Sequence, residues 1–203
     1  VRVEDCRGRN IGDGTIGAGH SNYVQFADTS GGAIRRNRFL GGWTEDMVST
    51  WHSGGHGKDR ELIIEDNHIQ GLVSDTPTAR AWKRGSGTGI ILSDGAGNSR
   101  NGWIICRNNT LLTPGQVGLQ IIDGPGLQLY GNVVYGERRS GNNNPMTTWE
   151  GNPQGVARDN RYWWTNEDGS HPDPWRHGGG GGMLFVNNVE DSSLDPADYV
   201  VVL

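Results

Sequence analysis

A short pattern recurs along the chain and constrains its fold more than any other feature. Two apolar residues are separated by one residue, an asparagine follows three positions after the second of them, and another apolar residue stands two positions beyond the asparagine. Clear copies are Leu62–Ile69, Ile104–Leu111 and Leu127–Val134. Because alternating apolar residues are typical of β-strands and asparagine is typical of turns, each copy predicts two short strands that meet at a corner.

Weaker copies extend the repeat over nearly the whole chain. They contain Asn37, Asn160 and Asn187, and the segment 1–6 carries Cys6 in the asparagine place. A structural turn of about 23 residues, lengthened by loop insertions, accounts for the spacing of the copies. We expect the corner asparagines to be structural, because asparagine tolerates left-handed backbone angles and stacked amides can hydrogen-bond to one another along the axis.

A second set of alternating segments precedes the asparagine strands. Its members are Val24–Asp28, Val48–His52, Ile90–Asp94, Leu119–Asp123 and, loosely, Met146–Glu150. Stacked turns of this kind share one core and pair backbone to backbone at about 4.8 Å per rung. The predicted fold class is therefore all-β: a parallel β-helix of about six or seven turns with long loop insertions, right-handed because parallel crossovers almost always are.

The predicted organisation is a single domain over residues 1–203. Repeats cover 1–189, and a C-terminal turn and capping strand cover 190–203. The 34 glycines fall at recurring places between apolar pairs, which favours an ordered chain. No initiator methionine or signal peptide opens the sequence, which fits either a processed chain or a fragment of a longer protein.

Composition and charge exclude some classes of partner. The net charge is −5 and there is no basic tract, so we expect no nucleic-acid partner. No apolar run has the length of a membrane span. Cys6 and Cys106 lie in different repeats, so we predict no disulfide between them.

The stacked two-strand repeat with asparagine corners resembles the right-handed parallel β-helix proteins of the pectate-lyase-like superfamily, from Val1 to about Val189. The resemblance implies a secreted or cell-surface protein that acts on polysaccharide. The implied chemistry is that of a lyase or a hydrolase of an acidic, uronic-acid glycan.

The second strands end in a column of polar residues if they stack in register. Asp28, Asp94 and Asp123 are candidate metal ligands in this column, with Ca²⁺ as the candidate cofactor, and His52 lies between carboxylates. The functional interpretation is an acid/base or Ca²⁺ site. The alternative is that each aspartate caps the backbone of a local turn, as the pairs Asp94–Gly95 and Asp123–Gly124 suggest.

Residues 43–60 concentrate acidic, basic and aromatic side chains. The candidate catalytic residues are His52 or Lys58 as the base, Arg60 as a clamp for the sugar carboxylate, Asp46 as an acid, and His56. Gly55-His56-Gly57 is similar to the Gly-His-Gly motif of polygalacturonase-type glycosidases. The other motifs of that family are absent, and a flexible glycine-rich corner explains the three residues equally well.

Candidate substrate-binding residues lie on strand ends and long loops. They are Trp51, Trp82, Arg84, Trp163 and Trp175. Indole faces can stack on sugar rings, although some of these rings could instead pack loops onto the solenoid.

A rival hypothesis needs no catalysis. The chain could be a fibre, spike or filament subunit that self-associates end to end through uncapped rungs, since no cap precedes Val1. A third hypothesis is a glycan-binding module. Turnover of a polysaccharide would support the enzyme, end-to-end assembly would support the fibre or filament subunit, and binding without turnover would support the binding module.

Overall fold

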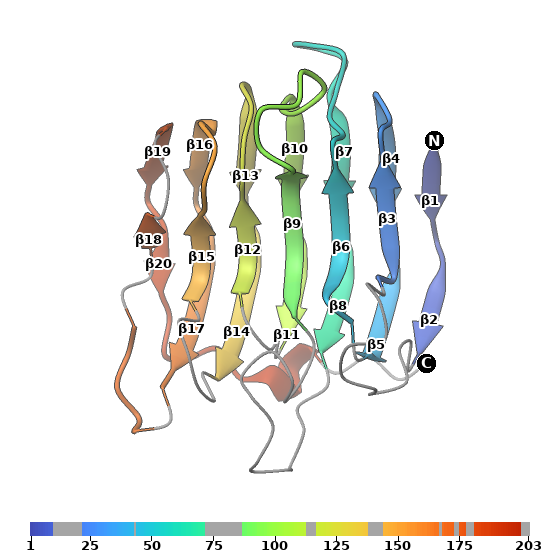
Figure 1. The fold of residues 1–203 in the computed structure, drawn as a ribbon. Helices are drawn as coiled ribbons and strands as arrows, with labels where there is room; N and C mark the ends of the chain where they lie inside the picture. Colours follow the sequence, from blue (N-terminus) through green and yellow to red (C-terminus); the bar gives the residue numbers. More distant parts are fainter. Residues whose placement is uncertain are drawn as a thin grey trace.

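The structure is a computed structural model, and it describes residues 1–9, 22–42, 44–71, 87–112, 117–137, 144–166, 168–172, 175–177 and 181–199. Within these residues the strands form three parallel sheets, and the chain visits the three sheets in turn. Figure 1 shows the strands of one sheet rising in front, the chain descending behind, and the rungs advancing from the N-terminal to the C-terminal end. The fold is a right-handed parallel β-helix, as the repeat predicts.

Each sheet is a stack of equivalent strands from successive turns. Sheet A contains, in order, β1 (Arg2–Glu4), β4 (Gly32–Arg35), β7 (Leu62–Glu65), β10 (Ile104–Arg107), β13 (Leu127–Tyr130), β16 (Gln154–Arg158) and β19 (Gly182–Val186). Sheet B contains β2 (Arg7–Arg9), β5 (Arg38–Gly42), β8 (His68–Gly71), β11 (Thr110–Leu112), β14 (Val133–Glu137), β17 (Arg161–Thr165) and β20 (Val189–Glu190). Sheet C contains β3 (Val24–Ala27), β6 (Asp46–Trp51), β9 (Thr88–Asp94), β12 (Val117–Ile121), β15 (Asn144–Thr148) and β18 (Trp175–His177).

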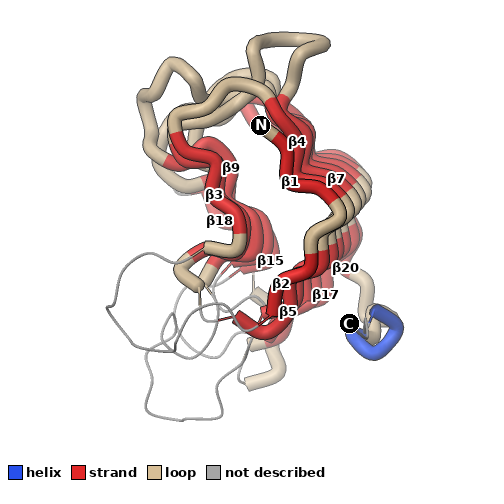
Figure 2. Tube along the Cα trace, turned by 90° about the vertical axis from the view of Figure 1, so that its right-hand side faces the viewer, coloured by secondary structure: helices blue, strands red, loops and turns tan. Residues whose placement is uncertain are grey.

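The core lies inside the coil, where Figure 2 shows the three sheets surrounding a common axis. Residues at equal positions of successive strands stack in buried columns. In sheet C, Val48, Ile90, Leu119 and Met146 are in register and all 0 % exposed. Each such side chain contributes about 1.5–3 kcal/mol of hydrophobic stabilisation, so the stacked columns hold the rungs together.

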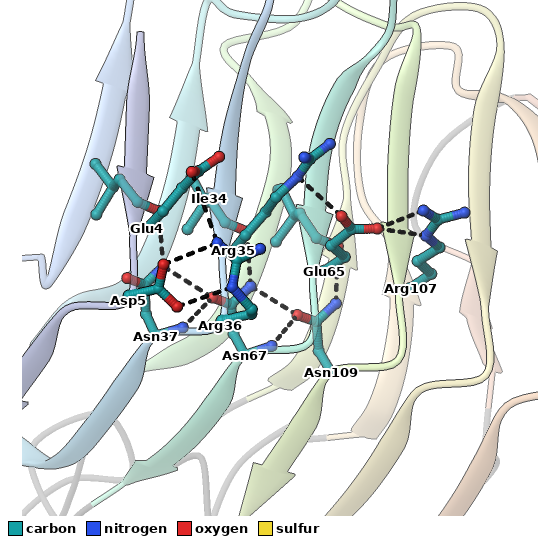
Figure 3. A network of polar contacts seen from close by, with 12 residues as sticks. Glu4, Asp5, Ile34, Arg35, Arg36, Asn37, Glu65, Asn67, Arg107 and Asn109 are labelled. Carbon is teal, nitrogen blue, oxygen red and sulfur yellow. Dashed lines mark hydrogen bonds and ion pairs between the residues drawn. The ribbon is translucent and has the colours of Figure 1, made fainter.

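An asparagine ladder runs along the corner between sheets A and B. Asn37 donates through Nδ2 to Oδ1 of Asn67 at 2.9 Å, and Asn67 donates to Asn109 at 2.8 Å (Figure 3). The ladder continues from Asn109 to Asn132 at 3.0 Å, to Asn160 at 2.8 Å and to Asn188 at 2.7 Å. Each Oδ1 also accepts a backbone N–H of the preceding rung, so the buried amides are satisfied. The structural role predicted for these asparagines is confirmed, and Cys6 occupies the first place, with its N–H donating to Asn37 Oδ1 at 2.9 Å.

Two details of the predicted corner are wrong. The last ladder residue is Asn188, not Asn187, because Phe185 and not Leu184 aligns with Ala157 of the rung before. The left-handed residue is also not the ladder asparagine but the one before it, as at Asp66 (φ 56°) and Asn187 (φ 51°). The preceding residue turns the chain, which leaves the asparagine amide free to point inward and bond along the axis.

The chain after β20 returns along the outside of sheet B. Arg161 binds Asp191, with Nε donating to Oδ2 at 2.8 Å, and its guanidinium also interacts with Tyr199 of the 3-10 helix Pro196–Tyr199. The capping strand predicted near the C-terminus falls partly on residues 200–203, outside the described residues. Both cysteines are free, as predicted. None of the helical segments in the described part of the chain has the length and hydropathy that a membrane span requires.

Candidate functional site

The candidate site lies at the corner between sheets C and A, where the strands of sheet C end. Asp28 and His52 turn the chain out of β3 and β6 with left-handed φ angles of 52° and 48°, and Glu150 does the same after β15 with a φ of 57°. Polar side chains therefore follow one another along this corner. The sequence predicted such a column, and the structure brings part of it together.

His52 and Asp28 lie side by side on neighbouring rungs. Their strands are in register, with Ala27 opposite Trp51, and His52 Nδ1 lies 3.5 Å from Asp28 Oδ1. This distance is longer than an ordinary hydrogen bond, so the contact is chiefly electrostatic. Arg100, on the loop after β9, donates through Nη1 to the same Asp28 oxygen at 3.1 Å. The carboxylate thus lies between an imidazole and a guanidinium.

The His52 ring is held in place by packing. The Trp51 ring stacks on it with centroids 3.6 Å apart and planes 25° from parallel. Gly95 lies so close that a Cβ there would meet the ring at 2.4 Å, and its φ of +83° is itself unfavourable for other residues. The imidazole keeps 25 % of its side-chain surface exposed, so it remains open to a ligand.

Asp94 lies next to this pair, although not in the predicted register. A register shift between Ser49 and Trp51 sets Asp94 opposite Trp51, and His52 N–H donates to the Asp94 backbone oxygen at 2.9 Å. Burial raises the pKa of the Asp94 carboxyl above its ordinary value. The Gly95 N–H and His52 oppose this, and the charges of Glu45 and then Glu150 add to it. A carboxyl with a raised pKa is a candidate proton donor at mildly acidic pH.

The Asp123 side chain binds backbone groups of neighbouring loops and does not join His52. Its oxygens accept from Gly97 N–H at 2.7 Å, Asn152 N–H at 2.9 Å and Asn101 Nδ2 at 3.3 Å. Burial alone would raise the pKa of Asp123, but these donors outweigh it and hold the pKa below the ordinary value. Asp123 therefore acts as the backbone cap that was the alternative interpretation.

The predicted Ca²⁺ ligands do not fit a common site as they stand. Asp28 binds Arg100, Asp123 binds backbone N–H groups, and the described residues contain no group of three or more side chains arranged to hold a metal ion. A Ca²⁺ requirement stays a prediction, and no step below depends on a metal.

Asp46 does not join His52. The two residues lie at opposite ends of β6, and six extended residues at about 3.3 Å each separate them by roughly 20 Å. Burial raises the pKa of Asp46 to about 7, and the neighbouring Glu45 contributes in the same direction. The sequence grouped the two residues because they are close along the chain, but an extended strand carries them apart.

The remaining predicted catalytic residues lie on the loop that follows His52. The His56 ring packs near Gly31 of the preceding rung, where a Cβ would meet it at 3.2 Å. Lys58 and Arg60 are exposed. Among the described residues, no hydrogen bond or ion pair joins either side chain to His52.

The two predicted sugar platforms whose side chains are described lie in different places. Trp51 belongs to the group formed by Asp28, Trp51, His52, Asp94 and Arg100, here called the His52 cluster, whereas Trp163 lies on β17 of sheet B, with its ring 4.3 Å from that of His171. Trp175 belongs to β18, but its side chain is outside the described part, as are Trp82 and Arg84 entirely.

The structure also shows charged residues that the sequence analysis missed. Besides Arg100, a stack of outward side chains crosses sheet A, where Glu65 binds Arg35 at 2.8 Å on one side and Arg107 Nε at 2.6 Å on the other (Figure 3). Tyr130 extends the stack: Arg107 Nη1 donates to its hydroxyl at 2.9 Å, and Arg158 lies 4.5 Å from its ring centre. The sequence contains a pattern that could have predicted this stack, because each of its members stands two positions before a ladder asparagine. The members are Arg35, Glu65, Arg107, Tyr130 and Arg158.

The His52 cluster combines a base, two flanking carboxyls, a cation and an indole face, which is a set of groups suited to moving protons on a polar substrate. No protein-family model, no curated protein and no solved structure matches this chain. The function is therefore argued from the fold and from this cluster.

Proposed function

We propose that the chain is a polysaccharide-acting protein of the pectate-lyase-like superfamily, secreted or at the cell surface, that cleaves a uronic-acid glycan at the His52 cluster. The reaction is β-elimination, with hydrolysis as the alternative outcome. One observation carries the proposal: a partly exposed imidazole, packed by Trp51 and Gly95, lies 3.5 Å from the Asp28 carboxylate, and its charge acts on the neighbouring Asp94 carboxyl. The fold supports it only as an analogy.

In this reaction His52 takes the proton from the carbon next to the sugar carboxylate. The electron pair of that C–H bond forms the new C=C bond, and the glycosidic C–O bond breaks. Asp28, 3.5 Å from Nδ1, stabilises the imidazolium that forms. Asp94, whose pKa is raised by burial, gives a proton to the departing oxygen.

The remaining members of the cluster position the substrate. Arg100 places positive charge beside the base, where the charge of the uronate grows as its carbon loses a proton. Trp51 offers an indole surface for a sugar ring. Lys58 and Arg60, on the adjoining exposed loop, can contact the same chain of sugars.

A polysaccharide screen tests the proposal. The purified chain is incubated with polygalacturonate, alginate and glucuronan, with Ca²⁺ or with a chelator, and two products are followed: the ultraviolet absorbance of unsaturated sugars and new reducing ends. Absorbance together with reducing ends supports elimination. New reducing ends without ultraviolet absorbance overturn elimination and indicate hydrolysis, in which Asp94 and Glu150 would be the pair of catalytic carboxyls. Binding without either product indicates a glycan-binding module, and no binding contradicts the proposal.

A second candidate function is end-to-end assembly into a fibre, spike or filament. It rests on Leu184, Val186 and Val189, which are 66 %, 43 % and 52 % exposed on β19 and β20, strands that pair on one side only within the described residues. Apolar edge strands tend to pair with another chain. Sedimentation at increasing concentration tests this: growth that is lost in Leu184→Lys/Val186→Lys supports assembly, and a monomer at every concentration refutes it.

A further inference from the structure

A cavity of about 550 Å³ lies on the outside of the asparagine corner, between sheets A and B. One rim is formed by corner residues, among them Asp5, Arg36 and Asp66. The other is formed by the first residues of four sheet B strands: Arg7, Arg38, His68 and Thr110. The His52 cluster lies on a different corner, between sheets C and A. The cavity is therefore separate from the site proposed above.

The cavity has an excess of positive charge. Asp5 is neutralised by Arg36, whose Nε and Nη2 both donate to it at 2.8 Å. Arg7 and Arg38 are in register on neighbouring strands, so two like charges stack one rung apart. Within the described residues neither guanidinium has a hydrogen bond or an ion pair, and Asp66 is the one remaining acidic group on the rim. Stacked like charges are destabilising unless an anion lies between them.

His68 is a second, independent sign of a ligand. It follows Arg38 in register and lines the cavity, yet its side chain is only 8 % exposed. Its Nε2 is buried and has no hydrogen-bond partner in the described part of the chain. Buried polar atoms are nearly always paired in folded proteins, so this imidazole nitrogen, near two guanidinium groups that have no partner among the described residues, points to a missing ligand.

We propose that this cavity binds a carboxylate or sulfate group carried by a sugar-sized molecule. Guanidinium groups bind such oxyanions through paired, charge-assisted hydrogen bonds, and Arg7 and Arg38 present two of them side by side. The volume lies in the range of organic ligand sites and far exceeds what one inorganic ion fills. Because this corner is distinct from the His52 corner, the site stands whether or not the chain cleaves glycans.

Calorimetric titration with galacturonate at low ionic strength tests the site, with galactose and inorganic sulfate as comparison ligands. Arg38→Gln weakens galacturonate binding by about tenfold or more, the loss expected for a charge-assisted pair. Arg9→Gln is the matched control: it removes one positive charge from the same strand as Arg7 but lies outside the cavity lining, and affinity stays within about twofold.

The comparison ligands decide what is recognised. Galactose, which lacks the carboxylate, does not bind. If sulfate binds as tightly as galacturonate, the proposal of a sugar-sized ligand is overturned and the cavity is a site for a free anion. No binding of either anion, or an equal loss in Arg9→Gln and Arg38→Gln, overturns the site itself.

The His68 ring provides a readout that does not depend on affinity. Burial, and then the charge of Arg38, lower the pKa of His68, and the other groups facing it are Thr110 on β11 and Asp66 at the corner. In an NMR titration, galacturonate raises the midpoint of the His68 ring signals, because an anion favours the imidazolium. Arg38→Gln raises the same midpoint without ligand. A midpoint unmoved by galacturonate contradicts binding beside His68.

Discussion

Replacing one rung of the asparagine ladder should remove much of the stability of the coil. In the centre of the ladder, Asn109 is 0 % exposed and makes four strong hydrogen bonds. Its Oδ1 accepts from Asn67 N–H at 3.1 Å and Asn67 Nδ2 at 2.8 Å. Its Nδ2 donates to the Ile64 oxygen at 3.0 Å and to Asn132 Oδ1 at 3.0 Å.

Asn109→Ala leaves two buried groups without a partner. They are the backbone N–H and one Nδ2 hydrogen of Asn67. The Ile64 carbonyl still faces β10 in the ladder of sheet A, and Asn132 Oδ1 keeps the bond from the Asn109 backbone N–H. At about 1–3 kcal/mol for each orphaned group, and with some relaxation of the corner, we expect a loss of about 4 kcal/mol. That is a large part of the roughly 5–15 kcal/mol that stabilises a folded domain.

The terminal ladder residue offers a matched control. Asn188→Ala deletes the same side chain, but Asn188 is partly exposed, so water replaces its lost bonds and the expected cost is about 1 kcal/mol. Urea unfolding followed by circular dichroism gives both values from the midpoint and slope. A loss below about 1 kcal/mol for Asn109→Ala, or equal losses for the two variants, would refute the reasoning that burial makes the ladder strong.

Three further changes test other parts of the structure. Burial raises the pKa of Asp46 to about 7 from an ordinary 3.8, so its protonated form stabilises the fold at low pH, and that stabilisation is lost as the pH rises from about 4 to about 7. In urea unfolding, Asp46→Asn should therefore be about 2–4 kcal/mol more stable than the natural chain at pH 8 and no more stable at pH 4. Gly95→Ala should displace the His52 ring, which a new Cβ would meet at 2.4 Å, and reduce the near-ultraviolet dichroism of the stacked indole; an unchanged spectrum would show that the ring is not held there. Glu65→Gln leaves Arg35 and Arg107 without their shared carboxylate and should lower the free energy of unfolding by about 2 kcal/mol in the same measurement. An unchanged free energy of unfolding would show that these ion pairs do not stabilise the fold.

The repeat in the sequence predicts the fold well because each element of the pattern has a local cause. Alternating apolar residues need a common interior, and a buried amide at every corner needs an equal amide above and below it. These causes place Asn67, Asn109 and Asn132 correctly. They fail at the last rung, where the pattern is too weak to distinguish Asn187 from Asn188.

The candidate site is harder to predict because it depends on register between distant segments. The pairing of Asp28 with His52 could be foreseen, because each follows its strand at the same spacing from the paired residues Val24 and Val48. The bulge that moves Asp94 opposite Trp51 could not, since alternation carries no sign of a one-residue slip. Arg100 lies on a loop 72 residues away from Asp28, and no local pattern links the two.

The most direct test of the account is turnover of an acidic polysaccharide by His52→Asn. His171→Asn is the control, because His171 lies on the sheet B side, where its Nδ1 is 2.9 Å from Glu190. The account predicts that the natural chain releases unsaturated products, that His171→Asn does so at the same rate, and that His52→Asn is slower by at least about a hundredfold, the usual contribution of a general base. Equal turnover by the His52 variant, or no turnover by the natural chain, would contradict the assignment of this corner as the active site.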